Sequence, residues 1–218
     1  MRSSHPAGRL PDPPSPIADD GDATRFCRTC AFAGACIAVG YGKPELEALH
    51  CLVDKDGREQ VLGFYLPGEV IGLNAIYPEH FPCDAVALEN TQFCRFSFPA
   101  MSALAARMPA VQQHLFRLLS KELGTASLLA GDHSADERMA AFLCDLARRY
   151  EARGFSGTHF TLSMSRGDIA NYLRLASETV SRVLTRFRSQ GLIAIEGRGL
   201  ELLDVKGLEK IGQNLLPD

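Results

Sequence analysis

The sequence predicts an α+β protein in which a small β domain is followed by a long helix and a winged helix-turn-helix. Three observations support this prediction. Turn residues separate short apolar runs between residues 53 and 98, a helical repeat of apolar residues begins at Pro99, and residues 163–204 combine two short amphipathic segments with a hairpin pattern. The predicted units are a tail (1–25), a cysteine-containing β domain (26–98), a helix (99–131) and a winged helix-turn-helix (135–218).

The composition is that of an ordinary globular protein. Of 218 residues, 46% are apolar and 22% are charged, which suits two domains of roughly 100 residues each. Residues 1–25 contain no apolar run, so we expect no secretory signal. No stretch approaches the roughly 20 apolar residues that span a bilayer. We therefore expect a cytoplasmic protein whose closely spaced cysteines serve metal or redox chemistry rather than disulfides.

The charge is distributed unevenly along the chain. Residues 1–134 carry 11 Lys and Arg against 15 Asp and Glu, whereas residues 135–218 carry 12 against 11, so their net charges are −4 and +1. Six arginines and three acidic residues between positions 164 and 199 give that segment a net charge of +3. A local positive excess in an acidic protein is typical of a segment that binds an anionic partner, with a solvated helix face as the alternative.

The β domain is predicted from its turns. Asp56-Gly57 and Pro67-Gly68 interrupt the apolar runs of residues 54–73, a pattern that predicts a hairpin followed by a further strand. Residues 84–98 have similar strand character. An antiparallel β domain is therefore expected.

The period of the apolar residues becomes helical from Pro99. Pro109 suits the first turn of a helix. The residues that follow it at helical spacing are Val111, Leu115, Leu118, Leu119 and Leu123. This stripe could pack within its own domain or form a seam with a second copy of the chain. A further helix is predicted over residues 135–154, with Cys144 on its apolar side as a core residue.

Residues 163–204 predict two short helices joined by a tight turn, followed by a β-hairpin. The apolar face of the first helix is formed by Ile169, Tyr172 and Leu173, and that of the second by Val180, Val183, Leu184 and Phe187. This arrangement is typical of a winged helix-turn-helix, whose second helix enters the major groove of DNA. A helix-turn-helix that packs only against protein is the alternative.

The polar face of the second helix has the chemistry to contact base edges. Arg182 can donate two hydrogen bonds to guanine, Glu178 can accept from cytosine, and Ser181 suits a polar edge or a thymine methyl group. Arg186 and Arg188 suit phosphates, which fix the register of a protein on DNA. These residues are the candidate nucleic-acid contacts.

Two runs in this segment resemble a known family. Met164–Leu173 and Glu178–Arg182 are similar to the DNA-binding domain of the cyclic-AMP receptor protein superfamily, and to its oxygen-sensing branch, the fumarate and nitrate reduction regulator (FNR). Glu178, Ser181 and Arg182 match the base-reading residues of that branch, and Ser177 stands where nucleotide-sensing members have arginine. The resemblance implies a transcription regulator rather than an enzyme. It implies a homodimer on a palindromic DNA site with TTGAT-like half-sites, further contacts from Ser177 and Thr179, and RNA polymerase as a partner.

The three N-terminal cysteines Cys27, Cys30 and Cys36 have the spacing C-x2-C-x5-C, which differs from both ferredoxin patterns. With His50 or Cys51 they could bind zinc, or they could act as a thiol switch. The resemblance implies instead an oxygen-labile 4Fe-4S cluster with Cys94 as the fourth ligand, and thiolates are the soft anionic donors that such clusters require. Cys83 follows Pro82 in a turn and is expected to be incidental. An iron-sulfur enzyme or electron carrier is the alternative from another class.

The resemblance also raises the question of a second effector. Cyclic-nucleotide members of the superfamily use a Gly-Glu pair and a later Arg-Ser-Ala stretch. Gly68 and Glu69 are present here, but the later stretch reads Pro-Cys-Asp-Ala, with a carboxylate at Asp84 and no arginine. We therefore expect no cyclic nucleotide to bind. Only 57 residues separate Cys36 from Cys94, so the β-roll of the family is expected to be shortened.

Two positions of the helix-turn-helix differ from the family pattern. Arg174 replaces the usual turn glycine, although a turn residue at positive φ favours glycine. Ala176 stands where threonine commonly caps the second helix, and Ser177 is the expected substitute cap.

Overall fold

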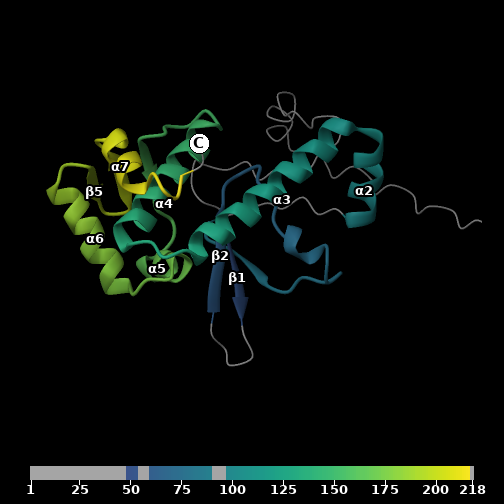
Figure 1. Ribbon diagram of the computed structural model, residues 1–218, viewed down its shortest axis with the longest axis horizontal. Coiled ribbons are helices and arrows are strands. Elements are labelled where there is room, and N and C mark those ends of the chain that lie inside the picture. The colour runs from purple at the N-terminus through teal and green to yellow at the C-terminus, as the bar shows by residue number, and fades with distance from the viewer. Residues whose placement is uncertain (1–47, 54–58, 90–96, 217–218) are drawn as a thin grey trace, which may run out of the picture.

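The computed structural model describes residues 48–53, 59–89 and 97–216, and its fold is α+β as predicted (Figure 1). The N-terminal part contains β1 (Ala48–Val53), β2 (Glu59–Tyr65), the short 3-10 helix η1 (Leu73–Ala75) and β3 (Asp84–Ala87). The middle part contains α2 (Phe98–Arg107) and α3 (Pro109–Ala130). The C-terminal part contains α4 (Ala135–Glu151), β4 (His159–Thr161), α5 (Arg166–Leu173), α6 (Ser177–Ser189), β5 (Ile193–Glu196), β6 (Gly199–Leu202) and α7 (Val205–Gly212).

The first sheet is antiparallel with strand order β2-β1-β3. β1 pairs with β2 from Ala48↔Tyr65 to Val53↔Glu59, with an irregularity after His50. The predicted hairpin is therefore confirmed. Within the described residues, β2 lies at an edge of this sheet.

The further strand predicted after Pro67-Gly68 is wrong, because η1 follows there instead. Gly72 has φ = 88°, a left-handed conformation that interrupts an extended chain. The ring of Phe81 lies so close to Gly72 that a Cβ atom there would be 2.7 Å from Cε1. The glycine and its aromatic neighbour thus turn the chain where the apolar pattern suggested a strand.

The region predicted as one long helix contains two, α2 and α3, which are separated at Met108. The backbone of Met108 is extended, with φ = −130° and ψ = 93°, because a residue that precedes proline is disfavoured in the α conformation. α3 then begins at Pro109, the predicted first-turn position. Figure 1 shows α3 running from α2 at one end of the molecule to the C-terminal helices at the other.

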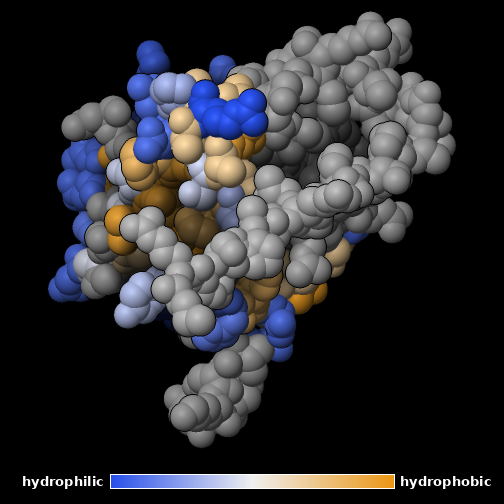
Figure 2. Space-filling view, turned by 90° about the vertical axis from the view of Figure 1, so that its right-hand side faces the viewer, coloured by the Kyte–Doolittle hydropathy of each residue, from blue (hydrophilic) through white to orange (hydrophobic). Residues whose placement is uncertain are grey.

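The apolar stripe of α3 has two different environments. Val111 is buried and packs with Met101 of α2 and with the partly buried Leu115. Farther along, Leu123 of the stripe is 71% exposed, and Phe116, which the predicted stripe does not include, is 62% exposed. Figure 2 looks onto the α2 end of the molecule and shows apolar residues gathered on its described surface beside hydrophilic ones. The start of the stripe therefore belongs to the core, and its last residue, Leu123, faces outward together with Phe116.

The C-terminal part is a winged helix-turn-helix with a three-stranded sheet of order β4-β6-β5. Ser134 and Glu137 form a capping box that begins α4. Cys144 lies in the core of this part at 1% exposure, as predicted, and burial raises the pKa of its thiol to about 11. The reading of Cys144 as a packing residue is therefore confirmed.

The largest hydrophobic core does not stop at the winged helix-turn-helix. It includes Val61, Phe64 and Leu66 from β2 and its following turn, together with residues of α4, α5 and α6. Phe64 contacts Phe142 and Tyr172, with ring centroids 5.9 and 5.3 Å apart. Part of the N-terminal sheet is thus held by the same core as the helix-turn-helix. Among the described helices, none is long and apolar enough to cross a membrane.

Candidate nucleic-acid interface

The turn between α5 and α6 determines how the second helix is presented. Ser165 and Asp168 form a capping box at the start of α5, with Ser165 Oγ accepting a hydrogen bond from the Asp168 amide at 3.1 Å. α5 ends at Arg174, which adopts the left-handed conformation with φ = 55° and ψ = 45°. The requirement for positive φ at this position was predicted from the sequence, and the structure confirms it.

The expectation that Ser177 caps α6 is wrong. The cap position is Ala176, which makes no side-chain capping hydrogen bond, and Ser177 is the first residue of the helix. Ala176 is the last residue with an extended backbone, with φ = −76° and ψ = 147°, and Ser177 is already helical. The amide groups of Thr179 and Val180 donate to Ala176 O.

α6 separates its apolar and polar residues as predicted. Val180, Val183, Leu184 and Phe187 are all at most 2% exposed. The opposite face carries the candidate DNA contacts, of which Thr179 is half-buried and the rest are exposed: Ser177, Glu178, Thr179, Ser181, Arg182 and Arg186. The helix is therefore anchored by one face and free to contact a partner with the other.

Two of these side chains are positioned by neighbours. Arg182 Nη2 donates to Thr179 Oγ1 at 3.4 Å, one helical turn away. Arg186 forms an ion pair with Asp136 in the first turn of α4. Arg186 therefore already has an anionic partner within the chain, which the sequence analysis did not anticipate.

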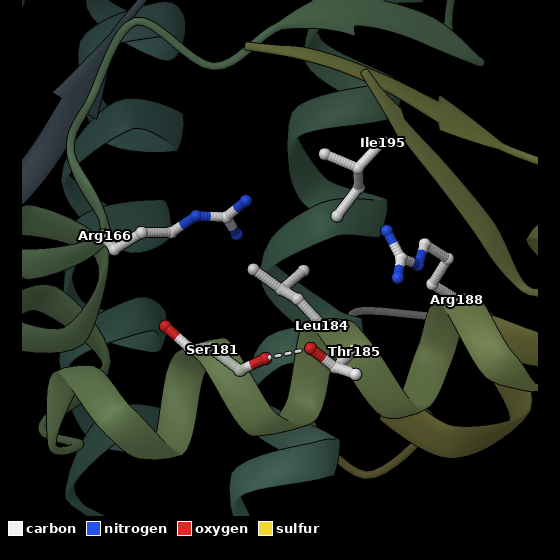
Figure 3. A pocket seen from close by; sticks show the side chains of 6 residues that line it. All are labelled: Arg166, Ser181, Leu184, Thr185, Arg188 and Ile195. Carbon is white, nitrogen blue, oxygen red and sulfur yellow. Dashed lines mark hydrogen bonds between the residues drawn. The ribbon is translucent and has the colours of Figure 1, made fainter. Parts of the chain in front are cut away.

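A cavity of about 190 Å³ lies between α5, α6 and the wing strand β5 (Figure 3). Its lining residues are Arg166, Ser181, Leu184, Thr185, Arg188 and Ile195. Figure 3 shows the guanidinium groups of Arg166 and Arg188 pointing into this space from opposite sides. On the side of the cavity that α6 forms, the hydroxyl of Thr185 donates to Ser181 O at 2.9 Å.

Arg166 is a candidate contact that the sequence analysis missed. Its Nη1 atom is buried and has no hydrogen-bond partner within the described part of the chain. Desolvation lowers the pKa of its guanidinium group, so an incoming anion would relieve an unfavourable environment. The signal in the sequence was an arginine directly after the capping Ser165, within a segment of positive net charge.

The predicted metal ligands are Cys27, Cys30, Cys36 and Cys94, and all four lie outside the described residues. Across residues 48–53, 59–89 and 97–216, no group of three His, Cys, Asp or Glu side chains is arranged to hold a metal ion. Cys83 lies in this range and is half-buried, with its sulfur 3.0 Å from Asn74 Nδ2.

Two domain families match the chain. Residues 137–211 match the Crp-like helix-turn-helix domain, and residues 46–108 match the cyclic nucleotide-binding domain. The first match covers the α4–α7 unit that carries the exposed face of α6. The second covers the N-terminal sheet together with α2.

Several characterised proteins are similar in sequence. The chain is 34% identical over 220 residues to the transcriptional activator protein FnrA of Stutzerimonas stutzeri, which covers 84% of this chain and 90% of that protein. It is 42% identical over 226 residues to the transcriptional regulatory protein Btr of Bordetella pertussis, covering 86% and 93%. The match to the transcriptional activator protein Anr of Pseudomonas aeruginosa, 46% identical over 151 residues, covers 68% of this chain and 62% of Anr.

The fold is also similar to a solved structure. FixK2 from Bradyrhizobium japonicum is 30% identical, with a TM-score of 0.63, and the match covers 83% of this chain and 88% of that one. Sequence, domain composition and fold lead to the same assignment. The chain therefore belongs to the Crp/FNR family of DNA-binding transcription regulators.

Proposed function

We propose that this chain is an oxygen-responsive transcription activator that binds a palindromic operator with TTGAT-like half-sites as a homodimer. In this proposal α6 reads the bases and a 4Fe-4S cluster held by the four cysteines controls the dimer. Zinc or a thiol switch in place of the cluster is the alternative. RNA polymerase is the proposed partner at the promoter.

The exposed face of α6 carries the DNA-binding part of the proposal. Glu178, Ser181 and Arg182 lie in its first two turns, all exposed, as residues that reach base edges must be. Arg182 suits guanine and Glu178 suits cytosine. Ser177 and Thr179 are proposed as further contacts from the first turn.

The cavity between α6 and the wing supports backbone contacts beside the base-reading residues. Arg166 and Arg188 both point into it (Figure 3), and two guanidinium groups facing one space suit a phosphate oxygen. Arg186 is proposed to reach a neighbouring phosphate, for which it must exchange its pairing with Asp136. Because that pair is exposed, breaking it costs little.

The outward-facing half of α3 supports dimerisation. Phe116 and Leu123 are seven residues apart and mostly exposed, and the half-buried Leu119 lies between them. Residues at this spacing share one side of a helix and can pair with the same residues of a second copy. Two copies joined along α3 would present two α6 helices to the two halves of a palindrome.

The donor chemistry supports the proposed cluster. Cys27, Cys30, Cys36 and Cys94 would each supply a thiolate, the ligand type that 4Fe-4S clusters take. The cluster would supply sensitivity to oxygen. A relative from Haemophilus influenzae that is 42% identical over 166 residues is named an anaerobic regulatory protein, in line with this role.

The pairing of Glu69 is the reason why the proposal includes no cyclic-nucleotide effector. Glu69 Oε1 accepts hydrogen bonds from Arg149 and Arg153 at 2.9 Å each. A carboxylate that is paired in this way is not available to a ribose hydroxyl. Asp84 is exposed and would repel a phosphate.

The DNA-binding part is tested by measuring operator affinity under anaerobic conditions. Replacing Arg182 by Ala should cost about 1 to 3 kcal/mol of specific binding and relax the preference for guanine at one position. Arg148→Ala is the matched control, because Arg148 lies on α4 and pairs with Glu209 within the same domain. Equal operator affinity for Arg182→Ala and the wild type would refute the assignment of α6 as the reading helix.

The sensor part is tested by metal analysis of anaerobically purified protein. We expect iron and acid-labile sulfide, and we expect both to be lost in Cys94→Ser but retained in the control Cys83→Ser. Air should then weaken dimerisation and operator binding of the wild type and of Cys83→Ser, whereas Cys94→Ser should not respond to air. Zinc without sulfide would establish the alternative, and iron retained by Cys94→Ser would refute the ligand set.

A further inference from the structure

The edge of β2 is paired with a side chain of the helix-turn-helix. Asn171 of α5 accepts a hydrogen bond from the amide of Val61 at 2.7 Å, and its Nδ2 donates to Glu59 O at 2.6 Å. Gln60 Nε2 also lies 3.2 Å from both Asn171 O and Asn171 Oδ1. One carboxamide thus satisfies an N–H and a C=O of an edge strand, as a neighbouring strand would.

The turn after β2 is held by Arg149 of α4 and by Arg153, which follows the C-terminal end of that helix. Arg149 donates to both carboxylate oxygens of Glu69 and to Phe64 O. Arg153 donates to Glu69 Oε1 and, through Nε, to Pro67 O at 2.8 Å. The side chains of Glu69 and Arg149 are only 15% and 14% exposed, so solvent screens this pair little.

Electrostatics and packing agree on this contact. Burial alone would raise the pKa of Glu69, but the charge and hydrogen bonds of Arg149, with Arg153 and the Leu66 amide, outweigh burial and lower it. Beside the ion pair, Phe64, Phe142 and Tyr172 form a mutual aromatic contact with centroids 5.3 to 5.9 Å apart. Buried aromatic pairs have preferred geometries, so this cluster restricts rotation between the two units.

The covalent link between α3 and α4 is held as well. Arg138 of α4 donates to Gly131 O at 2.8 Å and to His133 O at 3.1 Å in this short connection, and to Leu173 O at 3.2 Å at the end of α5. The connection is therefore tied to the same helix that Asn171 joins to β2.

We propose that residues 59–69, here called the clasp, fix the orientation of the helix-turn-helix relative to the rest of the chain, with Asn171 and Arg149 as its positioning residues. The inference rests on the proposed function, because the orientation matters when two copies bind one palindrome. The clasp leaves Glu178, Ser181 and Arg182 exposed, so it positions α6 without covering it. It thereby sets the separation of the two α6 helices and selects the spacing of half-sites in the operator.

The consequence for DNA binding follows from effective concentration. When one half-site is occupied, a fixed second α6 is already at the correct distance and angle, whereas a loosely attached one samples many positions. Loosening the clasp should therefore weaken binding to operators with the preferred half-site spacing. Binding to operators with altered spacing should weaken less or stay the same. A residue with only a structural role would lower the folded fraction and change all operators equally.

The test measures the binding of the 218-residue chain, purified anaerobically, to three palindromes. Their half-sites are at the preferred spacing or one base pair closer or farther. One base pair rotates a half-site by roughly 35°, so the wild type should bind the altered palindromes about tenfold or more weakly. Asn171→Ala and Arg149→Gln should reduce this discrimination to about threefold or less. The matched controls Asn214→Ala and Arg148→Gln remove contacts within the DNA-binding unit, to Glu137 and Glu209 respectively, and should discriminate like the wild type.

The proposal would be overturned if Asn171→Ala and Arg149→Gln both discriminated between the three palindromes as strongly as the wild type. Hydrogen exchange provides a second readout, in which the Val61 amide should exchange faster in Asn171→Ala while the amides of α6 keep their protection. If either variant fails to fold, Arg153→Gln removes a smaller part of the same contact and should lower discrimination in the same direction. A wild type that binds no palindrome would refute the proposed DNA-binding function instead, which separates the two failures.

Discussion

Arg174 provides a direct test of how the helix-turn-helix is built. Its amide donates to Asn171 O, and the next amide, of Leu175, donates to Ala170 O at 2.8 Å. These two bonds define a Schellman motif, whose left-handed residue is usually glycine. The left-handed conformation costs a non-glycine residue about 1 to 2 kcal/mol. We therefore expect the substitution Arg174→Gly to stabilise the protein.

The size of the effect follows from two opposing contributions. Glycine removes the left-handed strain but increases the conformational entropy of the unfolded chain, which costs about 0.4 to 1 kcal/mol. The net gain should be about 0.5 to 1 kcal/mol, or a rise in Tm of about 1 to 4 °C for a chain of this size. Urea unfolding followed by circular dichroism measures the free energy of unfolding.

The control for this substitution is Gln190→Gly. Gln190 is also exposed and also ends a helix, α6, but its φ is −84°. Glycine there has no strain to relieve and should lower the free energy of unfolding by about 0.5 to 1 kcal/mol. A result in which Arg174→Gly destabilises the protein as much as Gln190→Gly would refute the reasoning.

Glu69, Leu123 and Ala176 offer three further tests of the ion pair, the proposed dimer seam and the uncapped helix. The lowered pKa of Glu69 stabilises the fold at pH values above its unfolded-state value of 4.5, and this contribution should be lost as the pH falls below 4.5. In urea unfolding at a series of pH values, the free energy of unfolding of Glu69→Gln should therefore depend less on acid than that of the wild type. An equal dependence in both proteins would contradict the ion pair. Leu123→Glu places a charge in the proposed seam and should shift sedimentation of the anaerobic protein from dimer to monomer, whereas a dimer of wild-type stability would exclude this face. Ala176→Ser supplies the missing side-chain cap of α6 and should raise the free energy of unfolding by about 1 kcal/mol. An unchanged free energy of unfolding would show that the first amides of α6 do not lack a partner.

The local features of the C-terminal part were predictable because each depends on neighbouring residues. The burial of Val180, Val183 and Phe187 follows from helical spacing. The positive φ of Arg174 follows from the tight turn between two helices. Ser177 was assigned wrongly as a cap because propensity identifies only the residue type that suits a cap. The backbone decides the position, and Ala176 is the last extended residue before α6.

The contacts of the clasp could not be predicted from sequence patterns, because they join residues that are far apart in the sequence. Gln60 and Asn171 are 111 positions apart, and Glu69 and Arg149 are 80 positions apart. The sequence showed only that Gly68 and Glu69 match the Gly-Glu pair of cyclic-nucleotide members, since nothing near Glu69 in the sequence indicates an arginine partner. Arg149 near the end of α4 and Arg153 just after it acquire this role only when folding places the turn after β2 against them.

The edge of the N-terminal sheet and the position of the helix-turn-helix are physically linked. The edge strands of an open sheet leave backbone groups unpaired, and such a strand is a site for wrong pairing. Within the described residues, β2 is such an edge, and Asn171 pairs with two of its backbone groups. The DNA-binding unit therefore protects the sheet while the sheet holds the DNA-binding unit. Any signal that moves β2 away from α5 must break both arrangements together, so a change in the N-terminal part would reach α6 as a change in orientation.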